Sequence, residues 1–166
     1  MLIRYLILSL LLKHETTQNH DFTQPITRQY RILPHDMGFR DHIPNYRYLS
    51  FIELNIQQWF FTQNTTKKAQ WIIAAQQMTY LKQGRLLDKL RVKSQVLGWD
   101  NKYFYFRHEF LVKHTIIAVG LTKIVIMADN QTQPTSNIAN KPEQSHPVIT
   151  TWQANQREIK QQNPIA

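Results

Sequence analysis

The stretch RYLSFIELNIQQWFFTQ, residues 47–63, decides the fold. Apolar side chains recur in it at the three- and four-residue spacing of one helix face, while polar side chains occupy the other faces. The apolar positions are Leu49, Ile52, Ile56, Trp59 and Phe60. The segment therefore predicts one long amphipathic helix. Asn45, just before it, is a residue type that commonly caps a first helical turn.

Strands are predicted on both sides of this helix. Before it, alternating bulk indicates a strand, and Gly38 and Pro44 then mark a loop over residues 35–44. After it, the pattern changes to the two-residue period of strands joined by short turns, which favours antiparallel pairing as a meander. The strands are expected at residues 27–33, 71–80, 86–97, 102–112 and 115–127.

The strand segment at residues 86–97 has the clearest alternation. Leu90, Val92, Ser94 and Val96 are expected on one face, and a basic strip is expected on the other. That strip contains Lys89, Arg91 and Lys93. It is compatible with a solvated outer face or with attraction for the phosphates of a cofactor such as coenzyme A.

Length and composition indicate one folded domain, and the net charge indicates which partners it favours. The chain has 166 residues, no cysteine, and a formal net charge of +9. The absence of cysteine excludes disulfides and thiolate chemistry and fits a reducing compartment such as the cytoplasm. The charge favours anionic partners, but the aromatic residues lie mostly where a core is needed, so nucleic acid is not expected to bind.

The two ends of the chain differ from its centre. Residues 1–25 form an apolar segment, from Met1 to Leu12, and a linker. This segment is too short to span a bilayer. It fits a packed element, a peripheral membrane contact or a weak signal peptide. Residues 26–127 form the predicted domain, and residues 128–166 form a polar linker and a short helix.

Two motifs in the central region resemble a known family. The loop and helix start, RILPHDMGFRDHIPNYRYL at residues 31–49, are similar to the pattern Pro-x-Asp-x-Asp-x-x-x-His-[Met/Val]-Asn-Asn-x-x-Tyr of hot-dog thioesterases. The stretch VLGWDNKYFYF at residues 96–106 resembles the Leu-Gly-Trp-Asp-x-x-x-Phe-Tyr segment of the thioesterase superfamily member 6-like proteins. The resemblance implies an α+β hot-dog fold, in which a curved antiparallel sheet wraps around one long central helix.

The resemblance also implies a function, which is binding or hydrolysis of acyl-CoA or acyl-carrier thioesters at the start of that helix. Asp36 and His42 are the implied catalytic residues, and Asp41, Asn45 and Tyr48 the implied substrate contacts. Each has a structural alternative: Asp36 and Asn45 as caps, His42 as a buried histidine, and Tyr48 as core. Asp41 lies three residues from Gly38, where the family pattern has a carboxylate, and is the alternative considered for that missing group.

Two positions depart from the family pattern. Gly38 stands where the family places its second Asp, and Pro44 replaces the first Asn. These departures favour a second hypothesis, a non-catalytic acyl or lipid binding protein on the same scaffold. The resemblance further implies a homodimer or larger assembly. No metal site and no cofactor are expected, since the histidines do not fall into ligand spacings.

Overall fold

The computed structural model describes residues 21–63, 69–139 and 144–162. The hypotheses for Met1 to Leu12 lie outside the described residues. Within these ranges, no helix combines the length and the apolar character that crossing a membrane requires.

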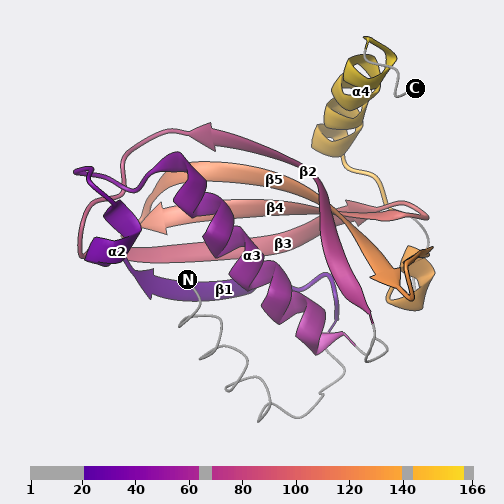
Figure 1. The fold of residues 1–166 in the computed structure, drawn as a ribbon, viewed down its shortest axis with the longest axis horizontal. Coiled ribbons are helices and arrows are strands. Elements are labelled where there is room, and N and C mark those ends of the chain that lie inside the picture. The colour runs from indigo at the N-terminus through magenta and orange to yellow at the C-terminus, as the bar shows by residue number, and fades with distance from the viewer. Residues whose placement is uncertain (1–20, 64–68, 140–143, 163–166) are drawn as a thin grey trace.

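The elements follow one another in the order strand, helices, strands, helix (Figure 1). A short helix and the long helix lie between the first two strands, so the stretch expected to be a loop is in part helical. The elements are β1 (Ile26–Arg31), α2 (Pro34–Met37), α3 (Asn45–Thr62), β2 (Gln70–Tyr80), β3 (Lys89–Trp99), β4 (Tyr103–Val112), β5 (Thr115–Ala128), β6 (Gln131–Gln133), the 3-10 turn η1 (Thr135–Asn137) and α4 (Pro147–Gln162).

The strands form one antiparallel sheet in the order β1-β3-β4-β5-β2, with β6 added to the end of β5. The helix α3 lies across one face of this sheet (Figure 1). The predicted antiparallel sheet with a packed helix is therefore confirmed. The expectation of one long helix is confirmed only in part, because α4, with 16 residues, is nearly as long as α3, with 18.

The predicted meander is correct for β3, β4 and β5 and wrong for β2. That strand pairs with β5 at the far edge of the sheet, and does not pair with β3. The segment between β2 and β3 forms backbone hydrogen bonds with residues at the end of the sheet. The N–H groups of Leu81 and Lys82 both donate to the Ile117 carbonyl, and the Leu87 N–H donates to the Ile32 carbonyl. These bonds carry the chain across the sheet end, from one edge to the other.

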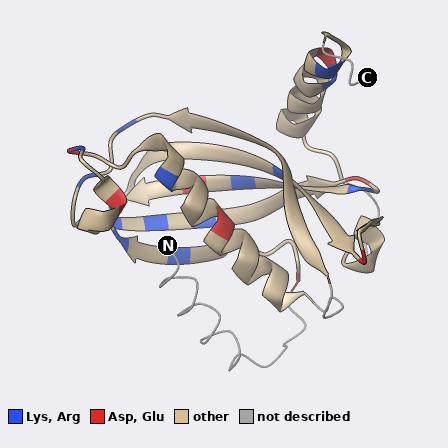
Figure 2. Cartoon of the chain, in the orientation of Figure 1, with Lys and Arg blue, Asp and Glu red and all other residues tan. Residues whose placement is uncertain are grey.

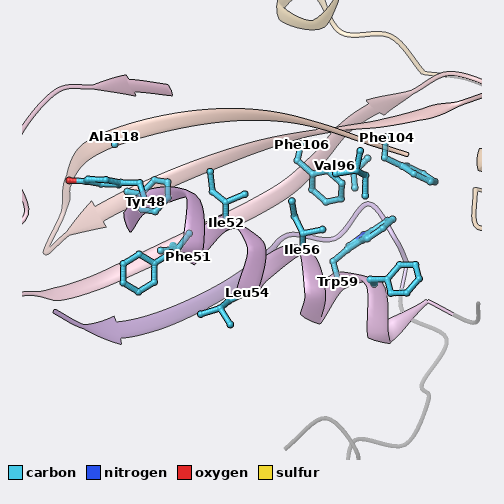
Figure 3. Close-up of a cluster of buried hydrophobic side chains, with 14 of the residues drawn as sticks. Tyr48, Phe51, Ile52, Leu54, Ile56, Trp59, Val96, Phe104, Phe106 and Ala118 are labelled. Atoms are coloured by element: carbon cyan, nitrogen blue, oxygen red, sulfur yellow. The ribbon is translucent and has the colours of Figure 1, made fainter. Parts of the chain in front are cut away.

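The core lies between α3 and the sheet face that it crosses (Figure 3). The predicted alternation in β3 is confirmed, since Leu90, Val92, Ser94 and Val96 are buried there. From α3, the ring of Trp59 packs edge-on against Phe104 and Phe106 of β4. Burying such rings removes the largest apolar areas from water, at roughly 25 cal/mol per Å². The other α3 side chains in this core include Phe51, Ile52 and Ile56, none of which is exposed to solvent.

A cluster of polar side chains interrupts this core under the middle of α3. Asn55 of α3 donates to the Ser94 hydroxyl at 2.9 Å and to the Val92 carbonyl at 3.1 Å, and accepts from the Tyr30 hydroxyl at 2.9 Å. Ser94 also bonds His108 Nδ1 at 2.7 Å. Complete burial lowers the pKa of His108 to about 3, so the ring is neutral. The cluster fixes which residues of α3, β3 and β4 face one another.

The opposite, outer face of the sheet is partly covered by α4. Ile149 and Trp152 of this helix are buried with Tyr105 and contact Leu121. The Tyr105 hydroxyl donates to Asp100 Oδ2 at 2.6 Å. Gly98 permits the chain before α4 to approach β3, because a side chain there would lie 2.4 Å from the Gln144 carbonyl oxygen. A cavity of about 610 Å³ lies between the start of α4 and the sheet, beside Gln77, Leu121 and Trp152.

Candidate active site

The loop that leads into α3 is fixed to the crossing between β2 and β3. The Ile43 N–H donates to the Gly84 carbonyl at 2.9 Å, and His42 forms an isolated β-bridge with Arg85. A side chain at residue 84 would lie 3.0 Å from Ile43 and 3.2 Å from Ile32, so these isoleucine side chains would have to shift to accept it. This close approach brings the crossing segment against the first turn of α3.

A cavity of about 260 Å³ opens at this junction. Its walls come from two places that are far apart in the chain, namely the start of α3 and the segment that follows β2. The lining residues are His42, Ile43, Asn45, Tyr48, Tyr80, Leu81, Lys82 and Gln83. Three of the five predicted site residues thus meet at one cavity.

His42 is held by the residue before it. Its Nδ1 lies 2.6 Å from Asp41 Oδ1. His42 is 27% exposed and Asp41 87%, so solvent and a ligand can reach the pair. The hydrogen bond from His42 lowers the pKa of Asp41, which keeps its carboxylate ionised. An ionised carboxylate can only accept, so the bond assigns a proton to Nδ1; in the neutral form of the ring, Nε2 is then the acceptor.

Tyr48 forms the apolar floor of the cavity. It is buried, and its ring packs edge-on against Tyr80 at 5.3 Å and Phe110 at 5.0 Å. Burial raises the pKa of Tyr48, although a backbone hydrogen bond with Gly84 opposes the shift. The phenol is therefore protonated at neutral pH. Tyr48 belongs both to the core, as the structural alternative holds, and to the cavity wall.

Asn45 lies at the mouth of the cavity but is not the cap of α3. It is the first residue of the helix, and the cap position belongs to Pro44, which has no side-chain hydrogen bond to offer. Capping by the Asn45 side chain was a wrong prediction, because the helix begins earlier than residue 47. The first turn of α3 contains no acidic residue, so no side chain of that turn offsets the partial positive charge of the helix start.

Asp36 lies away from the cavity, in α2. Its side chain is completely buried, and Oδ2 accepts from the Leu33 N–H at 2.9 Å. Oδ1 lies 3.7 Å from Arg47 Nε and 3.4 Å from His35 Nε2. Arg47 also donates to the His35 carbonyl at 2.8 Å. Asp36 therefore connects α2 to the first turn of α3 and does not line the cavity.

Sequence reasoning missed the second wall of the cavity. Tyr80, Lys82 and Gln83 were assigned to a strand end and a turn, without a site role. Their position depends on the pairing of β2 with β5, which the meander did not anticipate. The signal available was Gly84, one of 4 glycines in the chain, in the middle of that turn.

The arrangement suits hydrolysis of a polarised carbonyl compound. It brings together a hydrogen-bonded histidine, a residue type that can take up a proton, and the positive end of a helix, which can stabilise an oxyanion. Among the described residues, no three histidine or carboxylate side chains come together in a way that could hold a metal ion.

The family model of the thioesterase-like superfamily matches residues 32–149, which include this loop, α3 and the whole of β2 to β5. The chain belongs to the thioesterase-like superfamily. Among curated relatives, Protein THEM6 of Danio rerio is 27% identical over 88 residues. The match covers 50% of this chain and 44% of THEM6, so the chain matches less than half the length of that relative.

Solved structures show that this superfamily member has the hot-dog fold. The probable thioesterase from Bartonella henselae superimposes with a TM-score of 0.61 at 11% identity, covering 67% of this chain and 98% of its own. SAV2348 from Staphylococcus aureus, solved in complex with CoA, gives 0.61 at 12% identity, covering 84% and 87%. The gentisyl-coenzyme A thioesterase BH1999 gives 0.61 at 15%, covering 66% and 94%. At these identities the likeness concerns the fold.

Proposed function

We propose that the chain binds acyl-CoA or acyl-carrier thioesters in the cavity at the start of α3 and hydrolyses them there. The observation that carries the proposal is the meeting of His42, Asn45 and Tyr48 at one cavity beside a positive helix end. Membership of the thioesterase-like superfamily supports the reaction class. The volume of about 260 Å³ suits a thioester with a small acyl or aryl group.

In the proposed mechanism, His42 is the general base. Water gives a proton to Nε2 while its oxygen forms a bond with the thioester carbon. The carbonyl oxygen becomes an oxyanion, which the first turn of α3 stabilises. The C–S bond then breaks, and the sulfur leaves as a thiol after it takes the proton back from His42. Asp41 orients the ring and stabilises its protonated form.

The other predicted residues act around this step. Asn45 is placed to contact the carbonyl or the thiol portion at the mouth, and Tyr48 to contact the acyl group at the floor. Asp36 supports catalysis indirectly in this proposal, since it connects α2 to Arg47 and so positions the loop that presents His42. Asp36 matches the first Asp of the family pattern, and Gly38 stands at the position of the second.

The test is release of free CoA from a panel of acyl-CoAs of increasing chain length. Turnover is expected, and it should be highest for short acyl groups. The reference is the Asp36→Ala, His42→Ala double variant, measured on protein shown to be folded. Wild-type turnover no greater than that of this variant on every substrate would reject hydrolysis.

A non-catalytic acyl-binding role is the second candidate, and the loop itself favours it. Gly38 provides no carboxylate, and the buried carboxylate of Asp36 is already bonded. In this alternative the cavity holds an acyl ligand without turnover. Native mass spectrometry would then show a stoichiometric acyl-CoA complex that persists for hours. A protein that stays empty with every acyl-CoA offered would count against it.

A homodimer is part of the proposal. The outer edge of β2 ends the sheet within the described residues, and Tyr80, Leu81 and Ile72 beside it are 40%, 57% and 46% exposed. An unpaired edge with apolar neighbours is stabilised by pairing with another chain. Light scattering is expected to give twice the chain mass of 19.8 kDa. A clean monomer would contradict this pairing.

We place the protein in the cytoplasm, with peripheral membrane contact through residues 1–12.

A further inference from the structure

The outer face of the sheet has two halves of different character. Over β4, β5 and β2, α4 covers apolar side chains with Ile149 and Trp152. Over β1 and the part of β3 before Leu97, no described helix covers the face, and the outward positions are polar or basic. Figure 2 marks the Lys and Arg positions on these strands.

Three cations of β3 dominate the uncovered half. Lys89, Arg91 and Lys93 alternate with the buried Leu90, Val92 and Ser94, so they point away from α3. Residues two apart on a strand are about 6.6 Å apart. The three residues, called here the basic strip, therefore form a row of positive charge along the sheet. Arg31 of β1 lies directly opposite Lys89, which extends the row sideways.

Lys89, Arg91 and Lys93 form no ion pair with another described residue. Glu109 lies opposite Lys93 in the register, but its carboxylate binds Arg107 Nε at 3.0 Å. The salt bridges found among the described residues involve other cations. The Arg91 guanidinium donates to the Lys113 carbonyl at 3.5 Å. Like charges opposite or beside each other on a sheet oppose folding, so the strip has no stabilising role in the isolated chain.

The chemistry around the strip selects among anionic partners. Single-stranded nucleic acid needs aromatic side chains on which bases can stack, and the neighbours of the strip on this face are Thr27, Gln29, Gln95, Glu109 and Leu111. A protein partner needs an apolar anchor that is free to enter the contact, and the apolar side chain among these neighbours, Leu111, is already partly buried. An anionic lipid surface requires only charge, and each Lys or Arg near it strengthens binding about fivefold.

We propose that the basic strip docks the protein on anionic phospholipid headgroups. None of its three residues lines the cavity beside His42, so this contact is separate from the proposed catalytic site. Docking by the strip leaves the opposite face of the sheet, with α3, directed away from the bilayer.

Vesicle binding of the full chain tests the proposal. The probes are phosphatidylcholine vesicles and vesicles containing roughly one third phosphatidylserine. The strip variant is Lys89→Gln, Arg91→Gln, Lys93→Gln. The matched control is Lys102→Gln, Arg157→Gln, Lys160→Gln, which removes the same charge from a turn and from exposed positions of α4. Thermal unfolding confirms that both variants are folded.

Stronger binding to the anionic vesicles than to the neutral ones is expected, with a loss of roughly a hundredfold on anionic vesicles in the strip variant and little change in the control. The wild-type binding should weaken as salt is raised, because screening shortens the range of the attraction. Equal losses in both variants, equal binding to neutral vesicles, or transfer of the protein from vesicles to added single-stranded RNA would each overturn the proposal. CoA release in solution should be unchanged in the strip variant, which separates this test from that of the proposed function.

Discussion

Two histidines of this chain form hydrogen bonds of similar length through Nδ1, but one lies at a cavity and the other in the core. His42 lies 2.6 Å from a carboxylate at an open cavity, whereas His108 lies 2.7 Å from a hydroxyl in the closed core. The first is partly exposed, so solvent and a ligand can reach it. The second is completely buried and stays neutral far into the acid range. The difference teaches that a paired histidine becomes a candidate catalyst through access, and otherwise serves packing.

The largest expected effect is on turnover at the open site. His42→Gln should lower the rate of CoA release by about 10²–10⁴-fold, because it removes the general base, and should leave the unfolding temperature unchanged. His114→Gln, at an exposed turn, is the matched control and should keep full activity. Equal activity of the His42 and His114 variants would end the catalytic assignment.

The next effect concerns acid stability, and it comes from the closed histidine. Below pH 6.5 the unfolded chain binds a proton at His108, while the folded chain does not until about pH 3. The free energy of unfolding should therefore fall as pH drops through this window, by up to about 5 kcal/mol from this group, and show no dependence on it above pH 6.5.

Denaturant unfolding as a function of pH measures this slope. His108→Phe should flatten it, because no group at this position titrates, and Ser94 keeps its bond from Asn55. The same slope in the wild type and the variant would show that other groups control acid unfolding.

A third effect is on the stability of the polar cluster. Asn55→Ala should cost about 2–3 kcal/mol, since it leaves the Tyr30 hydroxyl and the Val92 carbonyl without their bonds and opens space in the core. Turnover per folded molecule should not change. Urea unfolding and an activity assay on the same samples check both parts. A loss of activity without a loss of stability would place the cluster in the reaction.

The smallest effect is expected from Asp41. Its side chain is almost fully exposed, and solvent screens its interaction with His42. Asp41→Asn should therefore lower CoA release by less than about tenfold. A loss as large as that of His42→Gln would show that Asp41 takes a direct part in the chemistry.

The fold was largely predictable because its signals are local. The apolar spacing of α3 and the alternation of β3 follow from the sequence around each residue, and both match the structure. The position of β2 was not predictable from local pattern, since it depends on bonds from Leu81 and Lys82 to Ile117 across the end of the sheet. The short helix α2 escaped notice because four residues give too little periodicity.

One wall of the candidate site was predictable because its residues are close in the sequence, and the other wall was not. His42, Asn45 and Tyr48 fall within one loop and helix start, so the motif located them together. The opposite wall comes from residues 80–83, whose position follows from the sheet order. Burial separates Asp36 from the cavity, and no motif shows burial, because its contacts with Leu33 and Arg47 form only after α2 and α3 pack.

The most direct test of the central claim is a crystal structure with an acyl-CoA analogue in which a non-hydrolysable thioether replaces the thioester. The acyl group is expected against Tyr48. The carbon that takes the place of the thioester carbonyl is expected between His42 and the first turn of α3. An analogue bound instead in the cavity beside α4, against Leu121 and Trp152, would contradict it.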